Sequence, residues 1–422
     1  MRILSRPPQH GLAALAAVML ASCTVDVPAL RTGDDAVDAS DAGDVDVSDA
    51  ADTTVEAEDA GETVDALDDG DAGDAGEADV SECPPGLANC DGTPGTCETS
   101  ITSDSAHCGA CRHDCLGGQC VDGKCRPVVL TIPGTHPYQL VLSSTDGTGD
   151  LYWTCETCEE FGVWKATSAF TAATGFAAVG VPGAKEFTTG IALGAFEVFW
   201  AESLTGEVRR IGKSGGTPWP MTTGSVPGTM EVATDGDHVY FSGANGKVSR
   251  VPTNVAGAPT EDLVTGLGSP RSVVLGSDRV YWGDSKAKKI SRANKDGTGA
   301  CDIATTSYAP WSIAFESPWV YWREGTDVYT EGRVMKARDE CPSLEIVELA
   351  TGQGGPRYLA LYDDYVYYVI LSGSIRRIPK AGGVSEELYM CSEQAHGIAV
   401  DDKAIYWTSW GAGKVYRLAH PL

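Results

Sequence analysis

Cysteine is the residue type in this 422-residue sequence whose spacing restricts its chemistry most tightly. Eight of the 14 cysteines fall within one short segment, 83–125. A segment of that size has little apolar core, and an even set of cysteines in it is typical of a disulfide framework in an exported protein. We therefore predict four disulfides, of undetermined connectivity, among Cys83, Cys90, Cys97, Cys108, Cys111, Cys115, Cys120 and Cys125.

Zinc is the alternative use of this cluster, because His107 and His113 stand beside three of the cysteines. A zinc ribbon needs a second CxxC some 15 to 20 residues after the first, whereas here Cys115 follows Cys111 by four residues. Disulfides and no metal are therefore the prediction. The run HCGACxxxC resembles a cysteine-rich module of predicted surface lipoproteins of myxobacteria, which implies a rigid spacer or a small interaction domain.

The remaining cysteines lie further along the chain. Cys155 and Cys158 form a CxxC that follows a predicted strand, whereas redox CxxC pairs open a helix that lowers the thiol pKa. We therefore predict that this pair staples a loop. Of Cys301, Cys341 and Cys391, at most two can pair with each other, which leaves one unexplained.

Histidines give little support for catalysis. There is no HExxH motif, and the long C-terminal part carries only His136, His238, His396 and His420. Streptogramin lyases use paired histidines with a glutamate and magnesium, but only His396 falls at a suitable position here, and no HxE accompanies it. We predict no catalytic residue and no cofactor, and we keep a lyase or hydrolase as the alternative.

A repeat with a period of about 40 residues organises the part of the chain that carries the later cysteines and the histidines. The copy Pro270–Gly297 has an apolar segment, an aromatic strand, a basic strand and a Gly-rich turn, all of period two. Seven aromatic pairs mark seven copies, with their second members 39 to 47 residues apart: Tyr152-Trp153, Phe199-Trp200, Tyr240-Phe241, Tyr281-Trp282, Tyr321-Trp322, Tyr367-Tyr368 and Tyr406-Trp407. A four-stranded sheet of this length cannot bury both faces alone, so the pattern predicts an all-β, seven-bladed β-propeller over residues 127–422.

The ends of this domain predict how the ring closes. The seventh copy stops after its third strand, Lys414–Leu418, and an extra strand, Val128–Ile132, precedes the first copy. We expect the extra strand to supply the missing outer strand of blade seven, which reduces edge exposure.

The repeats resemble the YWTD propellers of lipoprotein-receptor ectodomains, with blade seven (HGIAVDDKAIYWTSWGAGKVYRL) as the best match. The resemblance covers about 290 residues and implies architecture. It transfers no ligand, because the receptor type has six blades and the fourth motif position is acidic only in Glu202, Asp284 and Glu324.

Propeller ligands usually bind on the face where the innermost strands begin. Aligning the copies places one residue from each blade at the mouth of the central channel: Tyr138, Thr189, Gly228, Arg271, Trp311, Arg357 and His396. Guanidinium, aromatic and imidazole groups are enriched at binding hot spots. The alternative is that Arg271 and Arg357 pair with Asp284 and Glu324 and that Trp311 fills the channel. The blade acids themselves are expected to fix the turns between the second and third strands.

The N-terminus predicts export. Arg2 and Arg6 precede an apolar run, 11–20, that is too short to span a bilayer, so residues 1–22 are predicted to be a signal peptide. The sequence Leu20-Ala21-Ser22-Cys23 resembles the lipobox of bacterial lipoproteins, which implies lipidation of Cys23 and a membrane partner. Residues 26–82 hold 21 acidic residues and one base, so 23–82 is predicted to be a disordered, acidic tether after the lipidated cysteine.

These features predict an exported protein, lipid-anchored in the cell envelope at the outer membrane or cell surface, with a cysteine-rich module over 83–126. The expected role of the propeller is to bind a protein or carbohydrate. An envelope scaffold without a specific ligand is the main alternative. Nucleic acid is not an expected partner, because residues 83–422 carry 38 acids and 28 bases without a basic stripe.

Overall fold

The computed structural model describes residues 83–422 except 94–95, 133–134, 144–148, 159–160, 179–185, 223–227, 256, 327–330 and 392. The predicted signal peptide, the lipidation site Cys23 and the acidic tether lie outside the described residues. Within the described part every regular element is a strand. None of the described segments is a helix with the length and apolarity needed to cross a bilayer.

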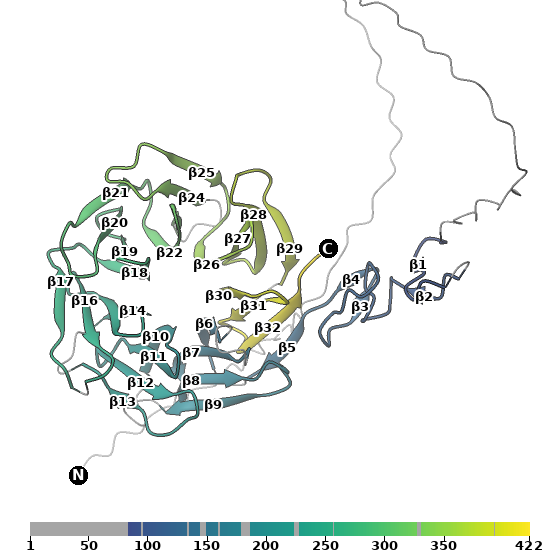
Figure 1. Ribbon diagram of the computed structural model, residues 1–422, viewed down its shortest axis with the longest axis horizontal. Coiled ribbons are helices and arrows are strands. Elements are labelled where there is room, and N and C mark those ends of the chain that lie inside the picture. Colours follow the sequence, from purple (N-terminus) through teal and green to yellow (C-terminus); the bar gives the residue numbers. More distant parts are fainter. Residues whose placement is uncertain are drawn as a thin grey trace, which may run out of the picture. The chain divides into compact units, whose positions relative to one another are not determined.

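Seven four-stranded antiparallel blades are arranged as a ring (Figure 1), which confirms the predicted seven-bladed propeller. Blades one to three comprise β6 (Pro137–Leu142), β7 (Leu151–Cys158), β8 (Phe161–Ala166) and β9 (Ala173–Ala178); β10 (Glu186–Leu193), β11 (Glu197–Glu202), β12 (Glu207–Gly212) and β13 (Trp219–Pro220); and β14 (Thr229–Thr234), β15 (His238–Gly243), β16 (Lys247–Pro252) and β17 (Glu261–Val264).

Blades four to six comprise β18 (Pro270–Leu275), β19 (Arg279–Asp284), β20 (Lys289–Asn294) and β21 (Cys301–Thr305); β22 (Pro310–Glu316), β23 (Trp319–Gly325), β24 (Gly332–Arg338) and β25 (Ile346–Ala350); and β26 (Pro356–Tyr362), β27 (Tyr365–Ile370), β28 (Ser374–Pro379) and β29 (Glu386–Met390). In each blade the first strand of the group is innermost.

Blade seven closes the ring. It contains β30 (Ala395–Val400), β31 (Ala404–Ser409) and β32 (Lys414–Ala419), and its outer strand is β5 (Val128–Thr131) from the start of the domain. Lys414 is paired with Thr131, and Arg417 is paired with Val128. This register confirms the predicted closure.

Blades one and two are joined at one point that the sequence did not predict. The end of β7 continues beyond its own blade and pairs with the start of β10, with Phe187 opposite Glu156. Cys155 to Cys158, predicted to belong to a stapled loop, are therefore part of strand β7.

The aromatic pairs build the core. All 14 side chains are at most 7% exposed. Because adjacent residues in a strand point to opposite faces, the two members of a pair fill the spaces on either side of their blade. Trp322 packs in one cluster with Tyr281 of blade four, while Tyr321 packs in another with Tyr368 of blade six. Each blade thus needs both neighbours.

The basic third strands add a second contact between blades. A cation near the far end of that strand donates to a backbone carbonyl of the next blade: Arg210 to Thr253, Arg250 to Lys295, Arg292 to Asp339, Lys336 to Lys380, and Arg417 to Ser168. The last of these joins blade seven to blade one.

The cysteine-rich module contains two small hairpins, β1 (Leu87–Ala88) with β2 (Thr99–Ser100) and β3 (Cys120–Val121) with β4 (Lys124–Cys125). Its eight cysteines form four disulfides, as predicted: Cys83–Cys97, Cys90–Cys111, Cys108–Cys120 and Cys115–Cys125. The module contacts the propeller through a hydrogen bond between the His113 ring and the carbonyl oxygen of His420, 2.7 Å long.

Candidate functional site

Every innermost strand has a bulge at the mouth of the central channel. In blade four, Pro270 is opposite Asp284 but Val273 is opposite Trp282, so one extra residue lies on the inner strand. The same register shift occurs in the other six blades. A bulge redirects side chains that a regular strand would send to opposite faces, so two consecutive residues of a blade can face the mouth.

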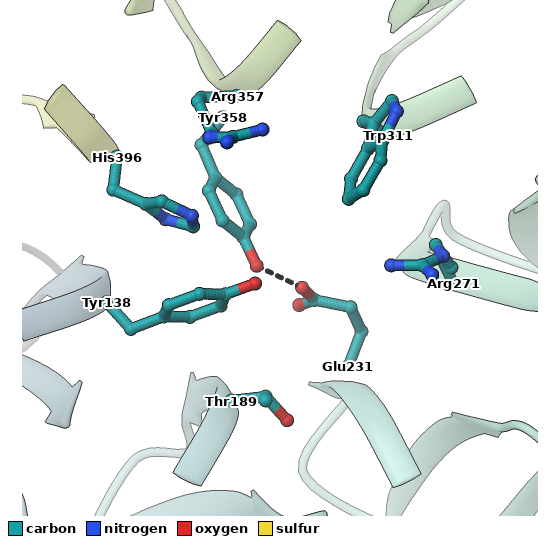
Figure 2. Close-up of a pocket in the computed structure, with 8 residues that line it drawn as sticks. All are labelled: Tyr138, Thr189, Glu231, Arg271, Trp311, Arg357, Tyr358 and His396. Atoms are coloured by element: carbon teal, nitrogen blue, oxygen red, sulfur yellow. Dashed lines mark hydrogen bonds between the residues drawn. The ribbon is translucent and has the colours of Figure 1, made fainter. Parts of the chain in front are cut away.

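Eight side chains line a cavity at this mouth (Figure 2): Tyr138, Thr189, Glu231, Arg271, Trp311, Arg357, Tyr358 and His396. Six of the seven positions aligned from the sequence are among them. Gly228 is not, and that assignment was wrong. In blade three Thr229 pairs with Gly243, which makes Met230, two residues later, the equivalent of Arg271.

Glu231 and Tyr358 were missed by the sequence reasoning. Both occupy the second residue of the bulge, directly after Met230 in blade three and Arg357 in blade six. Strict alternation along a strand would turn them away from the mouth. A signal was present, because Glu231 is an acid placed where the other blades carry Gln139, Gly190, Ser272, Ser312 and Gly397.

Hydrogen bonds between blades hold the inner strands in place. The hydroxyl of Thr154 donates to the carbonyl oxygen of Thr189 at 2.7 Å, and that of Thr408 donates to Tyr138 at 2.6 Å. Ser272 and Ser312 accept hydrogen bonds from the backbone N–H groups of Ile313 and Leu359 in the next blade. The mouth side chains therefore stand on a cross-linked backbone.

The cavity lining has a cationic half and an aromatic half. The guanidinium carbon of Arg271 lies 4.6 Å from the centre of the Trp311 ring, and that of Arg357 lies 5.8 Å from it. Opposite them the rings of Tyr138 and His396 lie 4.0 Å apart, and Tyr358 lies 5.6 Å from His396. Trp311, which the alternative expected to fill the channel, is part of the cavity lining.

Glu231 lies between the two halves and is 7% exposed. It accepts a hydrogen bond from the hydroxyl of Tyr358, drawn as a dashed line in Figure 2. Burial raises the pKa of Glu231 to about 7, opposed by the hydrogen bonds of Tyr358 and Gln139 and by the charge of Arg271. The carboxyl is thus partly protonated at neutral pH.

Tyr138 and His396 are neutral at pH 7. Burial raises the pKa of Tyr138 to about 12, and the charges of Glu231 and Glu156 add to this effect. Burial and the charge of Arg357 hold the pKa of His396 well below its ordinary value. The Nδ1 atom of His396 is buried and has no hydrogen-bond partner among the described residues.

Free space at the mouth is small. The cavity has a volume of about 30 Å³, enough for one or two water molecules. Deeper in the channel, a second cavity of about 410 Å³ is lined mainly by aliphatic residues of the inner strands and shares Glu231 and Tyr358 with the first. The mouth side chains therefore narrow the entrance to a wider channel.

The acidic residues of the second strands accept hydrogen bonds from backbone N–H groups of turns and from indole N–H groups. Asp284 accepts backbone hydrogen bonds from Gly268 at 2.6 Å and Ser269 at 2.9 Å. Glu202 and Glu324 accept from the indole N–H groups of Trp200 and Trp322. Arg271 does not pair with Asp284 as the alternative required; its Nε donates to the hydroxyl of Ser285 at 3.2 Å.

The propeller cysteines whose side chains the structure describes are disulfide-bonded. Cys301 is bonded to Cys341, which links blades four and five. Cys155 and Cys391 are also in disulfides. The side chain of Cys158 lies outside the described residues, so the Cys155–Cys158 staple stays a prediction.

In the part of the chain that the structure describes, no group of three His, Cys, Asp or Glu ligand atoms close enough to hold a metal ion lies at the mouth. Among described residues, two sets of such groups lie within 4.8 Å of one another, Cys90–His107–Cys111 and Cys108–Cys115–Cys125, and their cysteines are oxidised. His396 belongs to neither set. The segment Gly212–Gly216 has the form GxSxG, but it is the turn after β12 and opens no helix, as a nucleophile elbow must.

The chain matches no protein-family model and no curated protein in sequence. Solved structures with the same architecture include virginiamycin B lyase from Staphylococcus aureus, at 18% identity and a TM-score of 0.56 over 70% of this chain and 99% of the lyase. YCF48 from Cyanidioschyzon merolae matches at 11% identity and 0.55, over 69% and 98%. A nidogen/laminin complex matches at 19% and 0.46, over 63% and 97%. The likenesses to the lyase and to YCF48 show the fold. The YWTD resemblance stays a prediction.

Proposed function

We propose that the propeller is the binding module of an exported, lipid-anchored surface protein and that its ligand, a protein or carbohydrate, contacts the channel mouth. The observation that carries the proposal is the composition of the mouth: two guanidiniums, three aromatic rings and an imidazole converge on one cavity. If these side chains served only to fill the channel, small apolar residues from the seven blades would have been sufficient. The concentration of hot-spot residue types favours recognition over simple filling.

Export is supported by the disulfides. All described cysteines are oxidised, and disulfides of this density persist in oxidising compartments. Lipidation of Cys23 and a location at the outer membrane or cell surface rest on the sequence alone.

The test is the double substitution Arg271→Ala with Trp311→Ala in the full chain. Binding to intact cells and to a glycan array is expected to fall, while the free energy of unfolding changes by no more than about 1 kcal/mol, because both side chains are half-buried and lie outside the buried hydrophobic core. The matched control is Arg338→Ala with Trp319→Ala. It removes another Arg–Trp contact, of 5.3 Å, at the opposite end of the blade-five hairpin.

A scaffold without a specific ligand is the second candidate. The observation that favours it is the small cavity, since the mouth side chains contact one another and leave only about 30 Å³. If the mouth variant loses several kcal/mol of stability and no binding, the mouth is packing and the scaffold is correct. The fold does not decide, because propellers of this architecture include virginiamycin B lyase and a YCF48 solved with the D1 peptide.

A further inference from the structure

The deeper cavity of the channel extends away from the mouth and is large enough for a ligand of its own. Its volume is about 410 Å³, within the range of small-molecule sites. Glu231 and Tyr358 lie at its inner end, because they also line the mouth cavity. From there the lining continues to Thr234 and Leu275, the last residues of β14 and β18. This cavity, called the channel well below, therefore runs towards the face opposite the mouth.

The wall of the channel well combines aliphatic side chains with the edges of strands. Leu140, Ile191, Val273 and Ile398 from four different blades are among the lining residues. Apart from β10, each innermost strand pairs only with the second strand of its own blade. The other edge of such a strand presents backbone N–H and C=O groups. A slender chain of methylene groups that ends in hydrogen-bond donors matches both parts of this wall.

The charge inside the channel well is that of a carboxyl group. Glu231 is the one charged side chain among the described residues that line it, whereas Arg271 lines the mouth cavity alone. The carboxyl accepts a hydrogen bond from Tyr358, and an ionised carboxylate has about four acceptor positions. Burial raises the pKa of Glu231 to about 7. A cation in the well would favour the ionised form, which burial disfavours.

Aspartates surround the far end of the channel well. The turns that follow the innermost strands of blades three, four, six and seven are 235–237, 276–278, 363–364 and 401–403, and together they hold seven aspartates and one lysine. Asp235 has an ion pair with Lys295 at 3.1 Å, and Asp278 lies 3.9 Å from Arg279. The remaining five leave this rim negative. A cleft lined by one sign of charge concentrates ligands of the opposite sign.

The distance between the two sets of acids selects a linear ligand. Glu231 and Asp235 are four residues apart, which is about 13 Å along an extended strand. A molecule with an ammonium group at each end of an aliphatic chain can contact the buried carboxyl and the rim together. A fatty acid is disfavoured, because its carboxylate would lie near like charges at either end.

We propose that the channel well binds a linear aliphatic diamine or polyamine, which enters from the face opposite the mouth and places one ammonium on the carboxylate of Glu231 and another at the aspartate rim. Charge-assisted hydrogen bonds from the ammonium to the carboxylate fix the buried end. The methylene groups lie against the aliphatic wall. This site is separate from the ligand site of the proposed function, and the inference goes beyond that function.

The experiment is isothermal titration calorimetry of the full chain with three eight-carbon probes, a terminal diamine, the diol and the dicarboxylate. Residues 26–82 carry 21 acids that attract any amine, so the titration is repeated in a full chain with these acids changed to Asn and Gln. In both chains the expected result is saturable binding of one diamine with a Kd below about 1 mM. The diol should bind at least tenfold more weakly, and the dicarboxylate should not bind.

Variants assign the diamine to the channel well. Glu231→Gln keeps the shape of the side chain and should weaken binding about tenfold or more, equivalent to about 1.4 kcal/mol. Asp363→Asn with Asp364→Asn should weaken it about threefold at low salt and less at physiological salt, because exposed charges are screened. The matched control is Glu340→Gln, an exposed acid in the outer turn between β24 and β25, which should have no effect.

The outcomes separate this inference from the proposed function. Equal binding of diamine and diol, unchanged binding by Glu231→Gln, or binding that disappears with the acids of 26–82 would overturn it. Glu231 also lines the mouth cavity, so the double variant Arg271→Ala with Trp311→Ala decides the location. That variant should bind the diamine no more weakly than the original chain, and a loss would place the amine at the mouth and overturn the inference. The cell and glycan-array test of the proposed function is independent of all these results.

Discussion

Replacing Glu231 with glutamine is expected to stabilise the protein at neutral and alkaline pH and to change little below pH 4.5. Glutamine keeps an oxygen that can accept the hydrogen bond from Tyr358. It also removes the ionisation that burial makes unfavourable.

The magnitude follows from the pKa. Glu231 has a pKa of about 7 in the folded protein against an ordinary value of 4.5. The folded state therefore holds its proton more tightly than the unfolded state, so ionisation costs stability as the pH rises. The cost is absent below pH 4.5, grows between pH 4.5 and 7, and reaches about 3 kcal/mol above that range. The variant should be more stable than the original chain by about this amount at pH 8.

The assay is denaturant unfolding at fixed intervals from pH 4 to pH 9, with disulfides intact. Glu340→Gln is the matched control, because Glu340 is an exposed carboxylate. Subtracting the original chain at each pH cancels the contribution of every other titrating group. A stability difference that does not change with pH, or one that grows as the pH falls, would refute the assignment of a raised pKa to Glu231.

Two further predictions concern ring closure and the imidazole of the mouth. Arg417→Met removes hydrogen bonds to the carbonyl oxygens of Ser168 and Leu116. It should lower the free energy of unfolding by about 1.5 to 3 kcal/mol, as for other hydrogen bonds from charged donors. Urea unfolding measures this change, and a loss of stability no larger than that of Arg338→Met would contradict the prediction. Burial and the charge of Arg357 depress the pKa of His396, so its ring should stay neutral between pH 5 and 8. Its ring resonances, assigned with His396→Asn, should not move over this range, and a midpoint near 6.5 would contradict the burial argument. Below pH 6.5 the unfolded histidine gains a proton that the folded one does not, so the free energy of unfolding falls as the pH falls through this range.

The sequence predicted the parts of the structure that repeat. Seven aromatic pairs at a period of about 40 residues predicted seven blades, because one four-stranded sheet cannot bury both of its faces alone. The incomplete seventh copy and the strand at Val128 predicted the closure for the same reason: an open edge needs a partner. Eight cysteines predicted four disulfides, but spacing alone allows many pairings, so the connectivity came only from the structure.

The candidate site was predicted where the inner strand keeps the shared register and missed where one blade departs from it. Arg271, Trp311 and His396 follow a turn residue at the same offset. In blade three the inner strand starts at Thr229, two residues later than the sequence alignment assumed, so the alignment selected Gly228 in place of Met230. Glu231 and Tyr358 reach the cavity because of the bulge, and a bulge leaves no mark in the alternation of apolar and polar residues.

The pairing of β5 with β32 also orders the events of folding. The strand that completes blade seven is the first part of the domain to be synthesised, and its partner is among the last. It cannot pair within its own chain until β32 has been synthesised, so the contact that seals the ring has one of the largest sequence separations in the domain and is expected to form late. Until that moment two opposite borders of the nascent domain can recruit a neighbouring chain, and exchange of β5 between molecules is the expected misassembly.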